Sequence, residues 1–149
     1  MYHYESWDVY QALLELREIA AKLSRKRFPG YAPDLLQLNR AASSAVANLA
    51  EGAREQQPGH KLERYRTTLS SVSECNGVLT VLSRAFPHEE LVAEGRSLCE
   101  RASAMMTNLI RSVERSRGML TEPPRRVPSD EPPTVAPAPT RNATATDAD

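Results

Sequence analysis

The chain is poor in aromatic residues, in cysteine and in long apolar runs. Its 149 residues include one Trp, two Phe and five Tyr, and Cys75 and Cys99 are the only cysteines. Two cysteines are too few for a disulfide framework, so we expect two small buried thiols. No stretch approaches the roughly 20 apolar residues that cross a bilayer, and the first residues do not read as a secretion signal. We therefore expect a cytoplasmic protein without a membrane partner.

Motifs for catalysis and metal binding are also lacking. His3, His60 and His88 lie far apart, and none belongs to an H-E-x-x-H or E-x-x-H pattern, so zinc-protease and di-iron bundle chemistry are not indicated. The sequence has no G-x-S-x-G, no P-loop and no G-x-G-x-x-G. We expect no enzymatic activity, no metal and no cofactor.

What the chain does contain is four stretches in which apolar residues recur at alternating spacings of three and four, the signature of amphipathic helices. The first runs from about Ser6 to Arg27 and the second begins at Pro33. Three proline-containing breaks separate the four stretches: Phe28-Pro29-Gly30, Gln56-Gln57-Pro58-Gly59 and Pro87. Such short connections make neighbouring helices antiparallel. We predict an all-α fold, an up-down-up-down four-helix bundle over residues 1–117.

Residues 118–149 differ in composition from the rest. They hold seven of the eleven prolines among Thr, Ala and Asp, with three basic and five acidic side chains, which leaves a net charge of +2 on residues 1–117. A segment with so few large apolar side chains cannot offset its ordering entropy, so we predict a disordered tail. A polyproline II docking ligand is the alternative.

The second helix carries small residues on nearly every side and one narrow polar stripe. Because Arg40, Ser44, Asn48 and Glu51 follow at helical spacings, we predict a structural polar network in which Arg40 pairs with Glu51 or Glu74. A ligand or metal site is the alternative. Asn76 occupies a position where the third stripe would otherwise place Val or Leu, and a lone Asn at such a position commonly sets helix register.

These residues carry a resemblance to a known family. The motif consists of Gln37-Leu38-Asn39-Arg40-Ala41-Ala42, Ser44, Ala47-Asn48-Leu49-Ala50-Glu51-Gly52 and Ser73-Glu74. Together with Val9-Tyr10-Gln11 and Phe28-Pro29, it resembles the four-helix-bundle family of 23S rRNA intervening-sequence proteins over roughly residues 5–117. The chain departs from that family by having Asn39-Arg40 in place of two basic residues and Val46 in place of a proline.

The resemblance implies a homo-oligomer, a pentameric ring of bundles. A related accessory protein of diversity-generating retroelements forms such a ring and binds nucleic acid beside a reverse transcriptase. The partners that the resemblance implies are therefore further copies of the chain, RNA or DNA, and a reverse transcriptase.

Basic residues gather at one end of the predicted bundle, where the second helix ends, the third begins and the fourth ends. They are Arg54, Lys61, Arg64, Arg66, Arg111, Arg115 and Arg117. We predict that this basic pole binds RNA or DNA. The alternative, cations placed to favour helix C-termini, accounts for the last three residues but not for those that begin a helix.

A second apolar set on the first helix, Trp7, Tyr10 and Leu14, lies off the main stripe and predicts an oligomer interface. The sequence thus favours a homo-oligomeric helical scaffold that contacts nucleic acid. The alternative is a protein-interaction adaptor without a nucleic-acid role, in which the tail or this aromatic face engages the partner.

Overall fold

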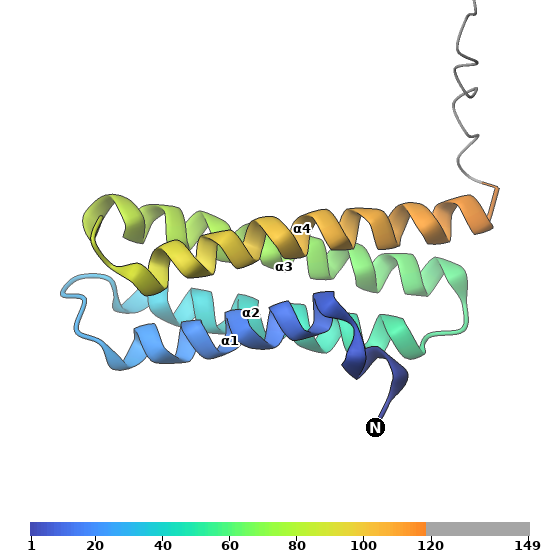
Figure 1. Cartoon of the computed structure of the whole chain (residues 1–149), viewed down its shortest axis with the longest axis horizontal. Helices are drawn as coiled ribbons and strands as arrows, with labels where there is room; N and C mark the ends of the chain where they lie inside the picture. Colours follow the sequence, from blue (N-terminus) through green and yellow to red (C-terminus); the bar gives the residue numbers. More distant parts are fainter. Residues whose placement is uncertain (119–149) are drawn as a thin grey trace, which may run out of the picture.

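The computed structural model describes residues 1–118, and within them the chain is all-helical, without a strand. Four long helices, α1 (Asp8–Arg25), α2 (Ala32–Arg54), α3 (Pro58–Ala85) and α4 (Glu90–Ser116), follow a short 3-10 helix, η1 (His3–Ser6). Figure 1 shows the four helices side by side and alternating in direction. α1 and α3 each contact both α2 and α4. The predicted antiparallel four-helix bundle is confirmed, while the predicted tail lies outside the described residues from position 119 onward.

Local chemistry sets the ends of the helices close to where the sequence predicts them. Gly30 has a φ of +85°, a left-handed conformation that suits glycine in the turn between α1 and α2. Pro33 lies in the first turn of α2, and Pro58 is the first residue of α3 rather than part of the break before it. α1 begins later than predicted because Ser6 belongs to η1, where its hydroxyl donates to the His3 carbonyl at 2.9 Å.

The core lies along the predicted apolar stripes. Every residue of the apolar stripes that the spacing predicts for α1 and α2 is buried: Val9, Leu13, Leu16, Ala20 and Leu23 on α1, and Leu35, Leu38, Ala42, Ala45, Leu49 and Gly52 on α2. On α3 the buried face is broader than the predicted stripe, because this helix contacts both α2 and α4: Thr68, Cys75 and Leu82 are fully buried, whereas Leu69 and Asn76 are only half-buried. None of the described helices has the length and apolar character that a bilayer crossing requires.

Candidate functional site

The predicted basic pole forms at the end of the bundle where α2 ends, α3 begins and α4 ends (Figure 1). Lys61 is not directed at solvent there. Its Nζ donates to the carbonyl oxygens of Gly52 at 2.8 Å and Ala53 at 3.2 Å, so it caps the C-terminus of α2 although it belongs to the start of α3. Burial lowers the pKa of this lysine. Favourable placement at a helix C-terminus therefore accounts for Lys61 after all.

The next three basic residues of the pole also have partners within the chain. Arg64 Nε lies 3.2 Å from a Glu51 carboxylate oxygen, and Arg66 Nη2 lies 2.7 Å from Glu114 Oε1. The Arg54 guanidinium stacks 4.7 Å from the centre of the Tyr2 ring, a cation–π contact. The two ion pairs reduce the positive charge that the pole presents to a polyanion, whereas the cation–π contact leaves the charge of Arg54 in place.

The remaining arginines of α4 are different. Arg111, Arg115 and Arg117 are exposed, and so is Arg101 further up the helix; none of the four takes part in an ion pair within residues 1–118. Arg101, Arg111 and Arg115 share one solvent-facing stripe with three small or neutral exposed residues, Ser97, Ala104 and Asn108, at alternating spacings of four and three.

We call Arg101, Arg111 and Arg115 the α4 arginine face. It extends about 21 Å along the helix, at about 1.5 Å per residue. α4 has four acidic residues, Glu90, Glu94, Glu100 and Glu114, and of these Glu114 pairs with Arg66. Arg101 was missed in the sequence analysis because it lies in the middle of a helix, away from the pole. The signal that could have found it is the helical spacing that places Arg101 on the same face as Arg111 and Arg115.

A polar network forms between α2 and α3, and it contains part of the predicted set. Ser44 Oγ lies 3.0 Å from Ser71 Oγ, and Asn48 Nδ2 donates to the Ser44 carbonyl at 2.9 Å. Arg64 Nη1 then donates to Asn48 Oδ1 at 3.2 Å and joins Glu51 to the same network. Its members bond one another, so the structure favours the structural interpretation of this stripe.

Arg40 lies outside this network, which corrects the prediction that it pairs with Glu51 or Glu74. It is exposed and forms no ion pair within the described residues. The reason is helical phase: at about 100° per residue, Arg40 lies about 200° round from the buried Leu38, on the solvent side of α2. Glu74, its proposed partner, accepts instead from Gln37 Nε2 at 3.0 Å.

Asn76 faces α4 rather than the network. Its Oδ1 is buried and has no hydrogen-bond donor, and it lines a cavity of about 370 Å³ between α3 and α4 together with Ser73, Cys99, Glu100 and Ser103. A buried acceptor without a donor costs stability.

The aromatic residues of the proposed oligomer surface are partly covered by the chain itself. Tyr10 packs edge-to-face against Tyr4 of η1 at 5.1 Å, and Trp7 against His3 at 6.1 Å. Leu14 is half-buried. α2 has no charged residue of its own between Arg40 and Glu51, and it exposes Leu36 (53% exposed) near its start, beside the end of α1.

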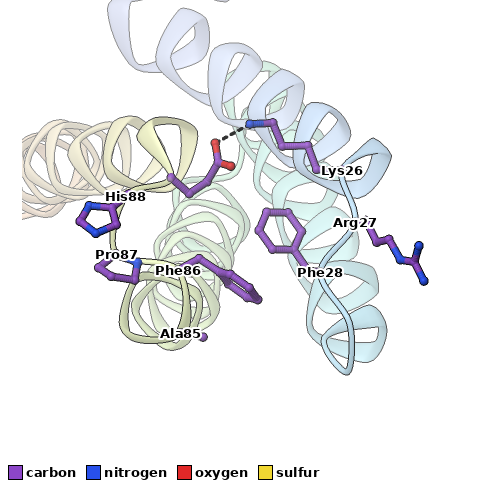
Figure 2. A pocket seen from close by; sticks show the side chains of 8 residues that line it. Lys26, Arg27, Phe28, Ala85, Phe86, Pro87 and His88 are labelled. Atoms are coloured by element: carbon purple, nitrogen blue, oxygen red, sulfur yellow. Dashed lines mark hydrogen bonds and ion pairs between the residues drawn. The ribbon is translucent and has the colours of Figure 1, made fainter.

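The opposite end of the bundle has a cavity of about 510 Å³, which sequence reasoning missed (Figure 2). Two loops that are some sixty positions apart line it, residues 26–28 and 85–89. Phe28 and Phe86 pack edge-to-face at 4.7 Å inside it. Lys26 Nζ lies 2.6 Å from Glu89 Oε1 and ties the two loops together. This ammonium, by its hydrogen bond, lowers the pKa of the Glu89 carboxyl.

Within residues 1–118 no three His, Cys, Asp or Glu side chains gather as a metal site would require. Cys75 and Cys99 are free and buried, and burial raises the pKa of each thiol to about 12. Neither has the exposed, electropositive surroundings of a reactive cysteine.

The resemblance to the intervening-sequence family rests on residues of α1, α2 and α3, and the structure places most of its α2 motif in the core and in the α2–α3 network. Comparison with family models gives no match to this chain, and comparison with curated proteins gives none either.

Proposed function

We propose that this protein is a non-enzymatic, homo-oligomeric helical scaffold that binds RNA or DNA through the α4 arginine face. The observation that carries the proposal is the row of exposed arginines without ion pairs on one side of α4. At about 3.4 Å per phosphate along one strand, a 21 Å row spans roughly six phosphates. Arginine binds phosphate oxygens in a bidentate manner, and each contact releases counterions.

Assembly is the second part of the proposal. α2 has no charged residue of its own between Arg40 and Glu51 and exposes Leu36, whereas a helix that faces only water normally carries charged side chains of its own there. The one charge close to this surface is Arg17 of α1, which donates to Ser43. The resemblance to the intervening-sequence family supports a pentamer and, through the related retroelement accessory protein, a reverse transcriptase as a partner. Five copies of the α4 arginine face would bind one long polyanion with an avidity far above that of a single copy.

The nucleic-acid part is tested by measuring the affinity for labelled single-stranded RNA and DNA as salt is raised. Replacing Arg101, Arg111 and Arg115 with Gln should reduce the slope of log K against log salt by about two to three per engaged protomer. Each change should alter the free energy of unfolding by less than about 0.5 kcal/mol, since the side chains are exposed.

The matched control removes the same charge elsewhere, by replacing the exposed Lys22, Arg25 and Arg84 with Gln. If control and α4 variants lose affinity equally, binding is nonspecific attraction to net charge. If the parent chain binds no nucleic acid at low salt, the adaptor hypothesis replaces this one.

The assembly part is tested by light scattering at micromolar concentration, where the mass should be several times 16.5 kDa. Ala47→Glu places a charge in the middle of the uncharged α2 surface and should dissociate the oligomer, because a buried unpaired charge is costly. Ala93→Glu, on the exposed side of α4, is the control. A parent chain that is monomeric throughout contradicts assembly.

A further inference from the structure

The cavity at the loop end of the bundle is an aromatic groove with a positively charged rim. Phe28 and Phe86 form its floor, and Tyr31 supports Phe86 edge-to-face at 5.3 Å. In Figure 2, Arg27 and His88 lie on opposite sides of the two phenylalanines, and Lys26 reaches across toward α4. We call this the Phe28–Phe86 groove.

The groove suits one particular kind of ligand. Its only carboxylate belongs to Glu89, which is held by Lys26 and caps α4 by accepting from the Leu91 backbone amide at 3.4 Å. Aromatic surfaces bind proline rings, and a polyproline II peptide loses little conformational entropy when it binds. Lys26 and Arg27 bring two positive charges to the rim against the one carboxylate of Glu89, and this net positive charge favours acidic side chains beside those prolines. At about 510 Å³ the groove has the size of typical ligand pockets.

Beyond residue 118, two stretches place acidic residues directly before a pair of prolines. Asp130-Glu131-Pro132-Pro133 joins two acidic residues directly to two prolines, and Pro137 follows four positions later. The other stretch, Glu122-Pro123-Pro124, has a single acidic residue and is followed by Arg125 and Arg126, which the rim would repel. We propose that the Phe28–Phe86 groove binds the chain's own segment 130–137, with its acidic pair at the cationic rim and its prolines on the phenylalanines.

The distances agree with this pairing. α4 has 27 residues, about 40 Å at 1.5 Å each, and its last turn lies at the end of the bundle opposite the groove (Figure 1). Fourteen residues lead from Gly118 to Pro132, and an extended proline-rich chain rises about 3.1 Å per residue, or about 43 Å in all. The first proline that can reach the groove is therefore the one that follows the acidic pair. This inference does not depend on the proposed nucleic-acid function.

A spin label on the full-length chain tests the proposal. In Val135→Cys the new thiol is the one to label, because Cys75 and Cys99 are buried and their pKa of about 12 keeps them protonated. Amide signals of residues 26–28 and 86–89 should lose intensity through paramagnetic broadening. Adding Asp130→Asn, Glu131→Gln and Pro132→Ala to the labelled chain should restore them, without touching a core residue. A label at Thr121→Cys is the control and should leave the groove signals intact.

Three results would overturn the proposal. The groove signals keep full intensity with the label at position 135, or the loss of intensity falls on the α4 arginine face instead. In the third, the loss at the groove disappears when labelled chains are diluted with unlabelled, NMR-silent ones, which would mean that the segment comes from another copy. Persistence of the loss on dilution supports binding within one chain.

Discussion

Gly52 and Gly77 differ in how closely their surroundings pack, so their alanine variants test the packing of the bundle. Gly52 lies in the last turns of α2, and a Cβ added there would lie 2.7 Å from Tyr65 Cε1 and 2.8 Å from Tyr65 Cδ1. Tyr65 is 1% exposed, so its ring has no free space into which to move. Gly77 lies in the middle of α3 on the exposed side, and a Cβ there meets no atom within 4 Å.

The two alanine variants should therefore change stability in opposite directions. Both gain helix propensity, about 0.8–1 kcal/mol in a helix interior and less near an end. Gly77→Ala receives this gain alone and should be more stable by about that amount. Gly52→Ala also pays for overpacking, typically about 1–3 kcal/mol. We expect Gly52→Ala to lie about 1–3 kcal/mol below Gly77→Ala in free energy of unfolding.

Urea unfolding followed by far-ultraviolet circular dichroism measures both values, and an unchanged slope against denaturant shows that only stability has changed. Gly95→Ala provides an intermediate step, because its Cβ would lie 3.1 Å from Leu79 Cδ1, the end of a flexible side chain. Equal stabilities of the Gly52→Ala and Gly77→Ala variants would refute the close approach of α2 and α3 at Tyr65.

Three further predictions concern single groups. Because Lys26 lowers the pKa of the Glu89 carboxyl, their ion pair stabilises the fold above the usual glutamate pKa, and this contribution is lost as the pH falls through the lowered pKa. In Glu89→Gln the free energy of unfolding should therefore depend less on pH below about pH 5 than it does in the parent chain. An unaltered pH dependence would contradict this. Asn76→Leu removes a buried acceptor that has no donor, beside a cavity, and should raise the free energy of unfolding by about 1–2 kcal/mol. Asn76→Asp should lower the free energy of unfolding, because it buries a charge there. A Leu variant less stable than the parent would show that the Asn76 amide has a hydrogen-bond partner. Cys75 and Cys99 should not react with a thiol reagent at mildly alkaline pH until denaturant is added, and fast reaction of the native protein would contradict their burial.

The sequence predicted the fold well because helix and core follow from spacing alone. Leu13, Leu38 and Leu79, for example, each belong to a stripe of apolar residues that recurs with the helical period, and each is fully buried. The prediction for Arg40 was wrong because each step of four residues turns about 40° further around a helix. A stripe that begins at Arg40 on the solvent side therefore reaches α3 only at Ser44 and Asn48.

Contacts between segments distant in the sequence were harder to predict. The capping of α2 by Lys61 depends on how tightly the chain turns between α2 and α3, and the Phe28–Phe86 groove depends on two loops that meet only in the folded bundle. Spacing along one helix contains no information about either. The α4 arginine face, by contrast, could have been predicted from the spacing of Arg101, Arg111 and Arg115 along α4.

The polar contacts of the bundle are distributed unevenly among its helices. Arg17 of α1 donates to Ser43 and Asn39 of α2, and the α2–α3 network fixes the next pair. Among the described residues, the side-chain hydrogen bonds and ion pairs that tie the α4 region to the rest of the bundle lie near its ends, from Glu89 to Lys26 and from Glu114 to Arg66. Apolar packing is not directional, so it resists separation of helices far more than rotation or sliding.

Amide hydrogen exchange should accordingly find α4 less protected than the three-helix unit of α1, α2 and α3. If it does, the helix that carries the α4 arginine face is also the one with the most freedom to turn that face toward a ligand.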